Sequence, residues 1–208
     1  MVEAEANKVR MKNRPRFLSG PHAKLPEAER LAGHNGTVIV SGIVDVSGNF
    51  TEIRLRQSTG APVLDQLALD AAKATRFTPA SDESGTPLSV PVSMPFEFYA
   101  SQSSEPGGGL VHYRCDQFVR DTDWWHSTHP EAKWSDYKLY TFMVGFAVLS
   151  NQNKNPVERF KAGGLIREQW PHWIQACREH PDQLFIDQTD YLAPLLHAVA
   201  KVGSEKRK

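Results

Sequence analysis

The strongest constraint on the fold is a change in hydrophobic spacing on either side of residues 101–109. This stretch reads SQSSEPGGG, a run of small, polar and helix-breaking residues that buries too little apolar surface to order itself. Before it, apolar residues alternate with a period of two in several segments, whereas after it they recur at helical spacing. The sequence therefore predicts an α+β domain at residues 21–100, a linker at residues 101–109 and a separate all-α domain at residues 110–203.

The first domain is predicted to be a small antiparallel three-stranded sheet with one packed helix. Residues 36–46 and 52–58 alternate apolar with polar side chains, and the SGN tripeptide between them supplies the turn of a hairpin. Residues 64–75 carry an apolar stripe at helical spacing, which predicts a helix lying on the sheet. A third strand is predicted at residues 87–99, with one face formed by Val90, Val92, Met94, Phe96 and Phe98.

The start of the chain differs from the domain that follows it. Residues 1–20 are polar and basic without sustained periodicity, which predicts a flexible tail. The formal net charge of the whole chain is zero and 40% of its residues are hydrophobic, so the composition indicates an ordinary globular protein and no nucleic-acid partner. No signal peptide is visible in the first thirty residues, and no apolar run approaches the roughly 20 residues that span a bilayer.

The second domain is predicted to contain about four helices. They are expected at residues 110–121, 131–150, 156–178 and 191–202, and Gly163, Gly164 and Pro171 are expected to break or kink the third. The two cysteines of the chain, Cys115 and Cys177, both lie in this half. Their even number allows a disulfide without requiring one.

Short motifs in the first domain resemble the C-terminal domain of TonB-type energy transducers. The run Leu25-Pro26-Glu27-Ala28, followed by Gly36, is similar to the segment that opens this domain in the family. Further similarities are Val44-Asp45 with Gly48 in the hairpin, Ser58-Thr59-Gly60 with Leu64-Asp65 before the helix, Arg76-Phe77-Thr78-Pro79-Ala80 after it, and Gly85, Pro87 and the final alternating strand. The sequence departs from the family at Leu25, where tyrosine is usual, and at Thr75, where tryptophan is common.

The resemblance implies a periplasmic protein of a Gram-negative bacterium that binds an extended segment of an outer-membrane TonB-dependent transporter. It also implies energy transfer from inner-membrane motor proteins through a membrane anchor, and no anchor occurs in these residues. We therefore expect either an anchor outside this sequence or a soluble periplasmic adaptor that reuses the module. An oxidising compartment favours a disulfide between Cys115 and Cys177.

Binding an extended segment by its backbone needs a free strand edge, and the third strand is the candidate. The direction of backbone hydrogen bonds alternates along a strand together with the side chains. Because Pro91 and Pro95 cannot donate to an internal ladder, the odd-numbered positions are predicted to face the free edge. The predicted partner-binding residues are Leu25, Pro26, Val90, Pro91, Val92, Ser93, Met94, Pro95 and Phe96.

No catalytic residue, cofactor or metal site is predicted. His126 and His129 lie near Asp121 and Asp123, but this stretch is typical of a helix start and lacks a metal-binding helix motif. A homodimer remains open, as do a second partner for the helical domain and an enzyme of unknown chemistry in that half. Residues 110–203 resemble no family.

Overall fold

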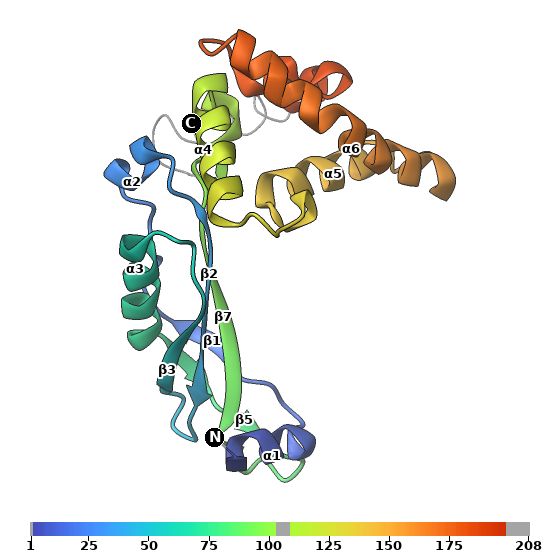
Figure 1. The fold of residues 1–208 in the computed structure, drawn as a ribbon. Helices are drawn as coiled ribbons and strands as arrows, with labels where there is room; N and C mark the ends of the chain where they lie inside the picture. Colours follow the sequence, from blue (N-terminus) through green and yellow to red (C-terminus); the bar gives the residue numbers. More distant parts are fainter. Residues whose placement is uncertain (1, 103–108, 199–208) are drawn as a thin grey trace, which may run out of the picture. The chain divides into compact units, whose positions relative to one another are not determined.

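The computed structural model describes residues 2–102 and 109–198, and the chain divides into two compact units (Figure 1). Unit 1 comprises residues 1–29 and 37–98, and unit 2 comprises residues 30–36 and 99–208. The fold class is α+β, as predicted, with a three-stranded antiparallel sheet in unit 1 and helices throughout the described part of unit 2. Most of the expected linker, residues 103–108, lies outside the described residues.

The central sheet has the order β3-β2-β7, so β2 is its middle strand (Figure 1). Strand β2 (Gly36–Val44) pairs antiparallel with β3 (Phe50–Gln57), and β7 (Val90–Phe98) lies on the other side of β2. The turn between β2 and β3 depends on Asp45, whose carboxylate accepts hydrogen bonds from the N–H groups of Ser47 and Asn49, each at 2.9 Å. Gly48 in this turn has a φ of 81°, a left-handed conformation that glycine adopts without strain.

Helix α3 (Pro62–Lys73) packs on the sheet through a stripe of small and aliphatic side chains: Leu64, Ala68, Ala71 and Ala72 are all buried. Asp65 holds the segment before this helix in place. Its carboxylate accepts hydrogen bonds from the N–H and the hydroxyl of Thr59, at 3.0 and 3.1 Å, and from the Ser58 hydroxyl. The predicted helix and hairpin are thus both present.

Regular structure also occurs in the first twenty residues, where the sequence predicts a tail. Helix α1 (Val2–Arg10) packs on β7, and β1 (Arg16–Ser19) pairs antiparallel with β4 (Arg76–Thr78). The rings of Phe17 and Phe77 meet edge to face across this pair, 6.4 Å apart. The sequence shows little periodicity here because, within residues 3–10 of α1, the buried side chains are Ala4 and the polar Asn7. Contacts with distant strands therefore stabilise this segment more than its own pattern does.

The predicted third strand is divided in two. Strand β6 (Pro87–Leu88) pairs with β5 (Ala80–Ser81) in a separate two-stranded sheet, and β7 begins only at Val90. The break falls at Ser89, whose carbonyl accepts a hydrogen bond from the Asn7 side chain. Ala80, Leu88 and Val90 form a small buried cluster beneath this junction.

Unit 2 is a helical assembly around aromatic side chains. Its longer helices are α4 (Cys115–Thr128), α5 (Lys138–Ser150) and α6 (Pro156–Glu179), and a further helix occupies residues 193–198. Shorter 3-10 helices are η1 (Ala100–Gln102), η2 (Leu110–His112), η3 (Trp134–Asp136), η4 (Phe185–Gln188) and η5 (Asp190–Leu192). Trp170 and Phe185 pack against Phe118 with ring centroids 5.5 and 4.2 Å apart. A Cys115–Cys177 disulfide joins the start of α4 to the end of α6.

Helix α6 has no break at the positions where the sequence predicts a break or a kink. It continues as one helix through Gly163, Gly164 and Pro171. One face of the helix is buried along its length, at Ala162, Ile166, Trp170, Trp173 and Cys177. We attribute the continuity to this packing, which outweighs the local preferences of glycine and proline. The last predicted helix, at residues 191–202, extends past the described part of the chain.

Candidate partner-binding surface

Strand β7 is an end strand of its sheet and alternates in exposure along its length. Val90 and Phe98 are buried at its two ends. Between them the even-numbered Val92, Met94 and Phe96 are half-buried, whereas Ser93, Pro95 and Glu97 are exposed and Pro91 is half-buried. The even-numbered side chains are therefore the set turned toward the protein. In the three-stranded sheet β7 pairs on one side only, with β2.

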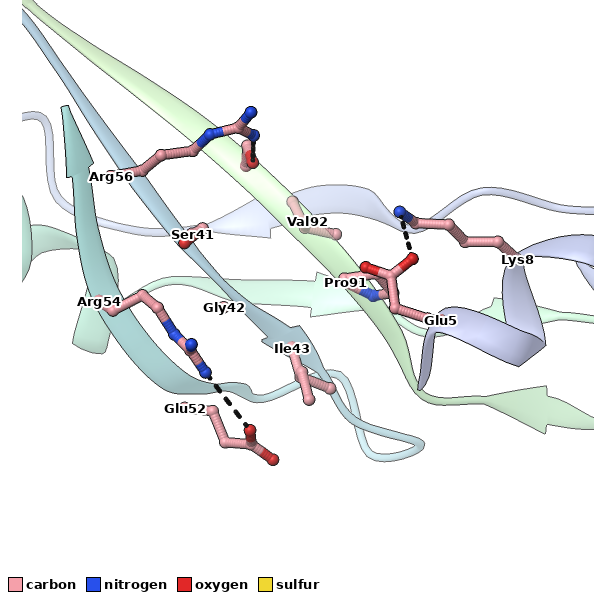
Figure 2. A pocket seen from close by; sticks show the side chains of 11 residues that line it. Glu5, Lys8, Ser41, Gly42, Ile43, Glu52, Arg54, Arg56, Pro91 and Val92 are labelled. Carbon is pink, nitrogen blue, oxygen red and sulfur yellow. Dashed lines mark hydrogen bonds and ion pairs between the residues drawn. The ribbon is translucent and has the colours of Figure 1, made fainter. Parts of the chain in front are cut away.

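A hollow of about 270 Å³, which we call the sheet groove, lies on the sheet beside β7 (Figure 2). Its described lining comes from β2, β3, β7 and α1: Ser41, Gly42, Ile43, Glu52, Arg54, Arg56, Pro91, Val92, Ser93, Glu5 and Lys8. Figure 2 shows Arg54 and Glu52 on the β3 side of the groove and Lys8 and Glu5 on the β7 side. The groove is polar, with three cationic and two anionic side chains.

The charged side chains of the groove interact mostly within their own elements. Lys8 pairs with Glu5 at 2.7 Å, and Arg54 lies 3.9 Å from Glu52. Arg56 instead reaches across the sheet and donates a hydrogen bond to the Ser93 hydroxyl at 3.4 Å. All of these groups are well exposed, so each pair contributes little to stability and can exchange its partner for a ligand.

Helix α1 lies beside the beginning of β7. The Asn7 side-chain amide donates to the Ser89 carbonyl at 3.0 Å, and Asn7 is only 7% exposed. Met11, one turn past Asn7, packs against the cluster of Ala80, Leu88 and Val90. A helix in this position shields part of an end strand from other chains. The spacing of Ala4, Asn7 and Met11 is the only sequence signal for this contact, and it is weak because one member is polar.

The structure brings together only some of the predicted site residues. Pro91, Val92 and Ser93 line the sheet groove among the described residues, whereas Leu25 and Pro26 lie half-buried in the coil before α2 (Glu27–Ala32). The groove also includes residues that the sequence gives no reason to select, namely the α1 pair and Arg54 and Arg56 of β3. An alternating strand indicates which side chains are exposed, but not which neighbouring element supplies charge beside them.

A buried polar cluster in unit 2 is centred on Asp121. Asp121 is only 2% exposed, and its carboxylate accepts hydrogen bonds from Arg120 and from the Tyr113 hydroxyl, each at 2.8 Å. Burial raises the pKa of Asp121, and Arg120 and Tyr113 oppose that rise. The Asn35 side chain donates to the Asp121 carbonyl, and Arg120 donates to the Arg30 carbonyl, so the cluster fastens residues 30–36 to α4.

The histidines singled out in the sequence lie against aromatic rings. His126 stacks on Trp134 and His129 on Trp125, with ring centroids 5.5 and 5.3 Å apart. Within residues 2–102 and 109–198, no group of three His, Cys, Asp or Glu side chains is arranged to hold a metal ion. Over the same residues, no helix combines the length and apolar character that crossing a bilayer requires.

Residues 21–100 match the family model of the C-terminal domain of the Gram-negative bacterial TonB protein. The match covers the same region as the motifs at residues 25–99, so this part of the chain is a TonB C-terminal-like domain. Residues 101–208 lie outside it. No curated protein and no solved structure matches the chain.

Proposed function

We propose that this chain is a periplasmic interaction protein whose TonB C-terminal-like domain binds an extended segment of an outer-membrane TonB-dependent transporter by strand addition to β7. The observation that carries the proposal is the strand order β3-β2-β7, which leaves one side of β7 without a partner strand in that sheet. The family match supports the class of partner. The disulfide between Cys115 and Cys177 is consistent with an oxidising compartment such as the periplasm.

Backbone pairing along β7 is limited by its prolines. In our assignment the backbone N–H and C=O groups of the odd-numbered residues point to the free edge of β7. Because proline has no N–H, Pro91 and Pro95 offer only their carbonyls there, whereas Ser93 offers its N–H and its carbonyl. Each added hydrogen bond contributes roughly 0.5–1.5 kcal/mol net, so three or four bonds provide a few kcal/mol before ordering costs. A micromolar dissociation constant needs about 8 kcal/mol, so side-chain contacts beside the pairing stretch must supply the larger part of the binding free energy. An affinity of this order suits a contact that must form and release.

The sheet groove adds a preference for charge. Arg54, Arg56 and Lys8 lie beside the strand that receives the segment, and they outnumber the carboxylates of Glu5 and Glu52. Exposed charges of this kind govern encounter rate and selectivity more than affinity. A segment with a carboxylate next to its pairing stretch is therefore the preferred ligand.

Helix α1 restricts where the segment can pair. It contacts Ser89 and shares the groove lining with Pro91, Val92 and Ser93, so it occupies the beginning of β7. The segment then pairs first beside residues 94–98. Pairing along the whole strand requires α1 to move away.

An NMR titration tests the proposal. The ¹⁵N-labelled chain is titrated with a synthetic peptide that carries the periplasmic segment of a TonB-dependent transporter from the same genome. We expect saturable shifts centred on the amides of Met94, Phe96 and Glu97, and no shifts with a peptide in which alternate residues are proline. Shifts centred on α3 or on unit 2 would contradict strand addition.

Binding of the transporter segment fits either of two roles, an energy transducer or an adaptor. In an energy transducer it is coupled to inner-membrane motor proteins through an anchor, and in an adaptor it joins the transporter to a second partner held by unit 2. Crosslinking in cells distinguishes them, because a transducer yields adducts with motor proteins and an adaptor does not.

A further inference from the structure

Helix α5 has more apolar surface than its neighbours cover. Lys138 is its only charged residue, and the rest of the sequence LYTFMVGFAVLS is polar only at Thr141, Ser150 and the Tyr140 hydroxyl. Packing buries Leu139, Tyr140, Met143 and Ala147. Phe142 and Leu149 remain exposed, with Leu149 at 64%. Helices that are apolar all round are normally enclosed on all sides.

The first part of α6 continues this exposed apolar surface. Val157 is 63% exposed and Phe160 is 83% exposed, which is unusual for a phenylalanine in a soluble protein. Between the two helices lies a hollow of about 320 Å³, lined by Val144, Val148, Phe160, Gly163 and Gly164 among others. We call the end of this helix pair, residues 149–160, the hairpin tip; its exposed apolar residues are Leu149, Val157 and Phe160.

The charge on and next to the hairpin tip is predominantly positive. Residues 149–168 contain the cations Lys154, Arg159, Lys161 and Arg167 and the carboxylates Glu158 and Glu168, which gives a net charge of +2. The whole chain has a net charge of zero. The local excess of cations therefore coincides with the exposed apolar side chains of the hairpin tip.

This combination selects one kind of occupant. A second copy docking by two-fold symmetry would place two net-positive surfaces against each other, which disfavours a dimer at this site. An anionic lipid bilayer instead accepts apolar side chains roughly 5–10 Å deep and attracts basic residues at the level of the phosphates. We propose that the hairpin tip inserts into the interface of an anionic phospholipid bilayer. This adds a lipid contact of unit 2 to the protein contact proposed for unit 1.

The test is sedimentation of the full chain with two kinds of vesicle, pure phosphatidylcholine and phosphatidylcholine mixed with phosphatidylglycerol. We expect binding to the mixed vesicles only, weakened by added salt. Phe160→Ser should lower the partition coefficient by about tenfold, and Lys161→Gln by about fivefold. Val63→Ser removes another exposed valine, on α3 of unit 1, and should leave binding unchanged.

Circular dichroism checks that each variant keeps the wild-type helix content, and a second substitution, Leu149→Ser, repeats the test at a separate position. Equal binding to both kinds of vesicle, no binding to either, or wild-type binding by both serine variants would overturn the proposal. Light scattering without vesicles measures the molar mass of the chain in solution. A dimer that dissociates in Phe160→Ser would overturn the proposal and assign the hairpin tip to contact with a second copy.

Discussion

The side-chain amide of Asn7 donates a hydrogen bond to the main-chain carbonyl of Ser89, 82 positions further along the chain, at a distance of 3.0 Å. This contact fixes α1 at the point where β6 ends and β7 begins. It connects the stability of the N-terminal helix with access to the strand that we propose as the docking site.

Asn7→Ala should lower the free energy of unfolding of unit 1 by about 1 kcal/mol, because one largely buried hydrogen bond is lost. It should also speed amide hydrogen exchange in the first half of β7. Urea unfolding followed by NMR measures the free energy of unfolding, and native-state hydrogen exchange measures the amide exchange rates in β7. Val9→Ala, at a side chain of the same helix that is 92% exposed, should change neither quantity. Unaltered exchange in Asn7→Ala would mean that α1 does not shield β7.

Gly48→Ala should destabilise unit 1 much more than Gly85→Ala. Both glycines have nearly the same left-handed φ, 81° and 84°. A Cβ at Gly48 would lie 2.0 Å from the Phe77 carbonyl oxygen, whereas a Cβ at Gly85 meets nothing within 4 Å. We expect a loss of about 1–2 kcal/mol for Gly85→Ala from the backbone alone and several kcal/mol for Gly48→Ala. Urea unfolding measures both, and equal losses would show that the Phe77 contact is relieved at no cost.

Replacing Pro91 and Pro95 together with alanine should strengthen binding of the transporter peptide. The substitutions restore two backbone N–H donors that we assign to the outer side of β7. The donor at residue 95 lies where the segment pairs first, and the donor at residue 91 adds to it when α1 moves away. Each donor contributes roughly 0.5–1.5 kcal/mol, which corresponds to about two- to tenfold in affinity. Isothermal titration calorimetry gives the constants. Pro87→Ala, in the neighbouring strand β6, is the matched control and should have no effect; unchanged affinity in the double variant would exclude these positions from pairing.

Acidification should change the contributions of two aspartates to the free energy of unfolding in opposite directions. Hydrogen bonds from Asn49 lower the pKa of Asp45, so its ionised form stabilises the fold above the usual value of 3.8, and this contribution is lost as the pH falls through the lowered pKa. Burial raises the pKa of Asp121, so its contribution is greatest below 3.8 and is lost as the pH rises through the raised pKa.

Urea unfolding of the wild type, Asp45→Asn and Asp121→Asn over acidic to neutral pH separates the two effects. The advantage of the wild type over Asp45→Asn should shrink toward low pH. Its advantage over Asp121→Asn should grow in the same direction. Parallel curves for the two variants would show that burial does not control the titration of Asp121.

Replacing both Cys115 and Cys177 with serine should destabilise unit 2. The bond joins residues 62 positions apart, and the chain-entropy model assigns a loop of this length about 4 kcal/mol. All five tryptophans lie between residues 124 and 173, so tryptophan fluorescence during thermal unfolding reports on this unit alone. A reducing agent added to the wild type should reproduce the lower midpoint. A midpoint that neither treatment changes would contradict a structural role for the bond.

Local pattern was sufficient to predict the hairpin, helix α3 and the α+β class. Each depends on a signal within about twenty residues: the SGN turn, the alternating strands, and the stripe that includes Leu64 and Ala68. The family motifs followed from the same segments, since Asp65 and Gly48 perform local tasks that fix their identities.

Local sequence patterns do not predict contacts between residues that are far apart in the chain. Asn7 is a polar residue on a short helix, and its burial follows only from the position of the Ser89 carbonyl. The division between β6 and β7 has the same cause. Arg56 alternates as an exposed strand residue should, but its contact with Ser93 depends on the order of strands in the sheet. Pro171 illustrates the opposite case: the helix does not break there, and we attribute this to the packing of Trp170 and Trp173.

The membership of residues 30–36 in unit 2 has a consequence for how the gene can be divided. The flanking residues on both sides belong to unit 1, so the two units are interleaved in the sequence. A fragment that stops at residue 100 keeps the whole family-matched region but removes Asp121, whose carbonyl binds the buried Asn35. Such a fragment exposes an internal segment of the other unit. Recombination that exchanges the C-terminal half between relatives must therefore also exchange this heptapeptide, and the two pieces should be inherited together.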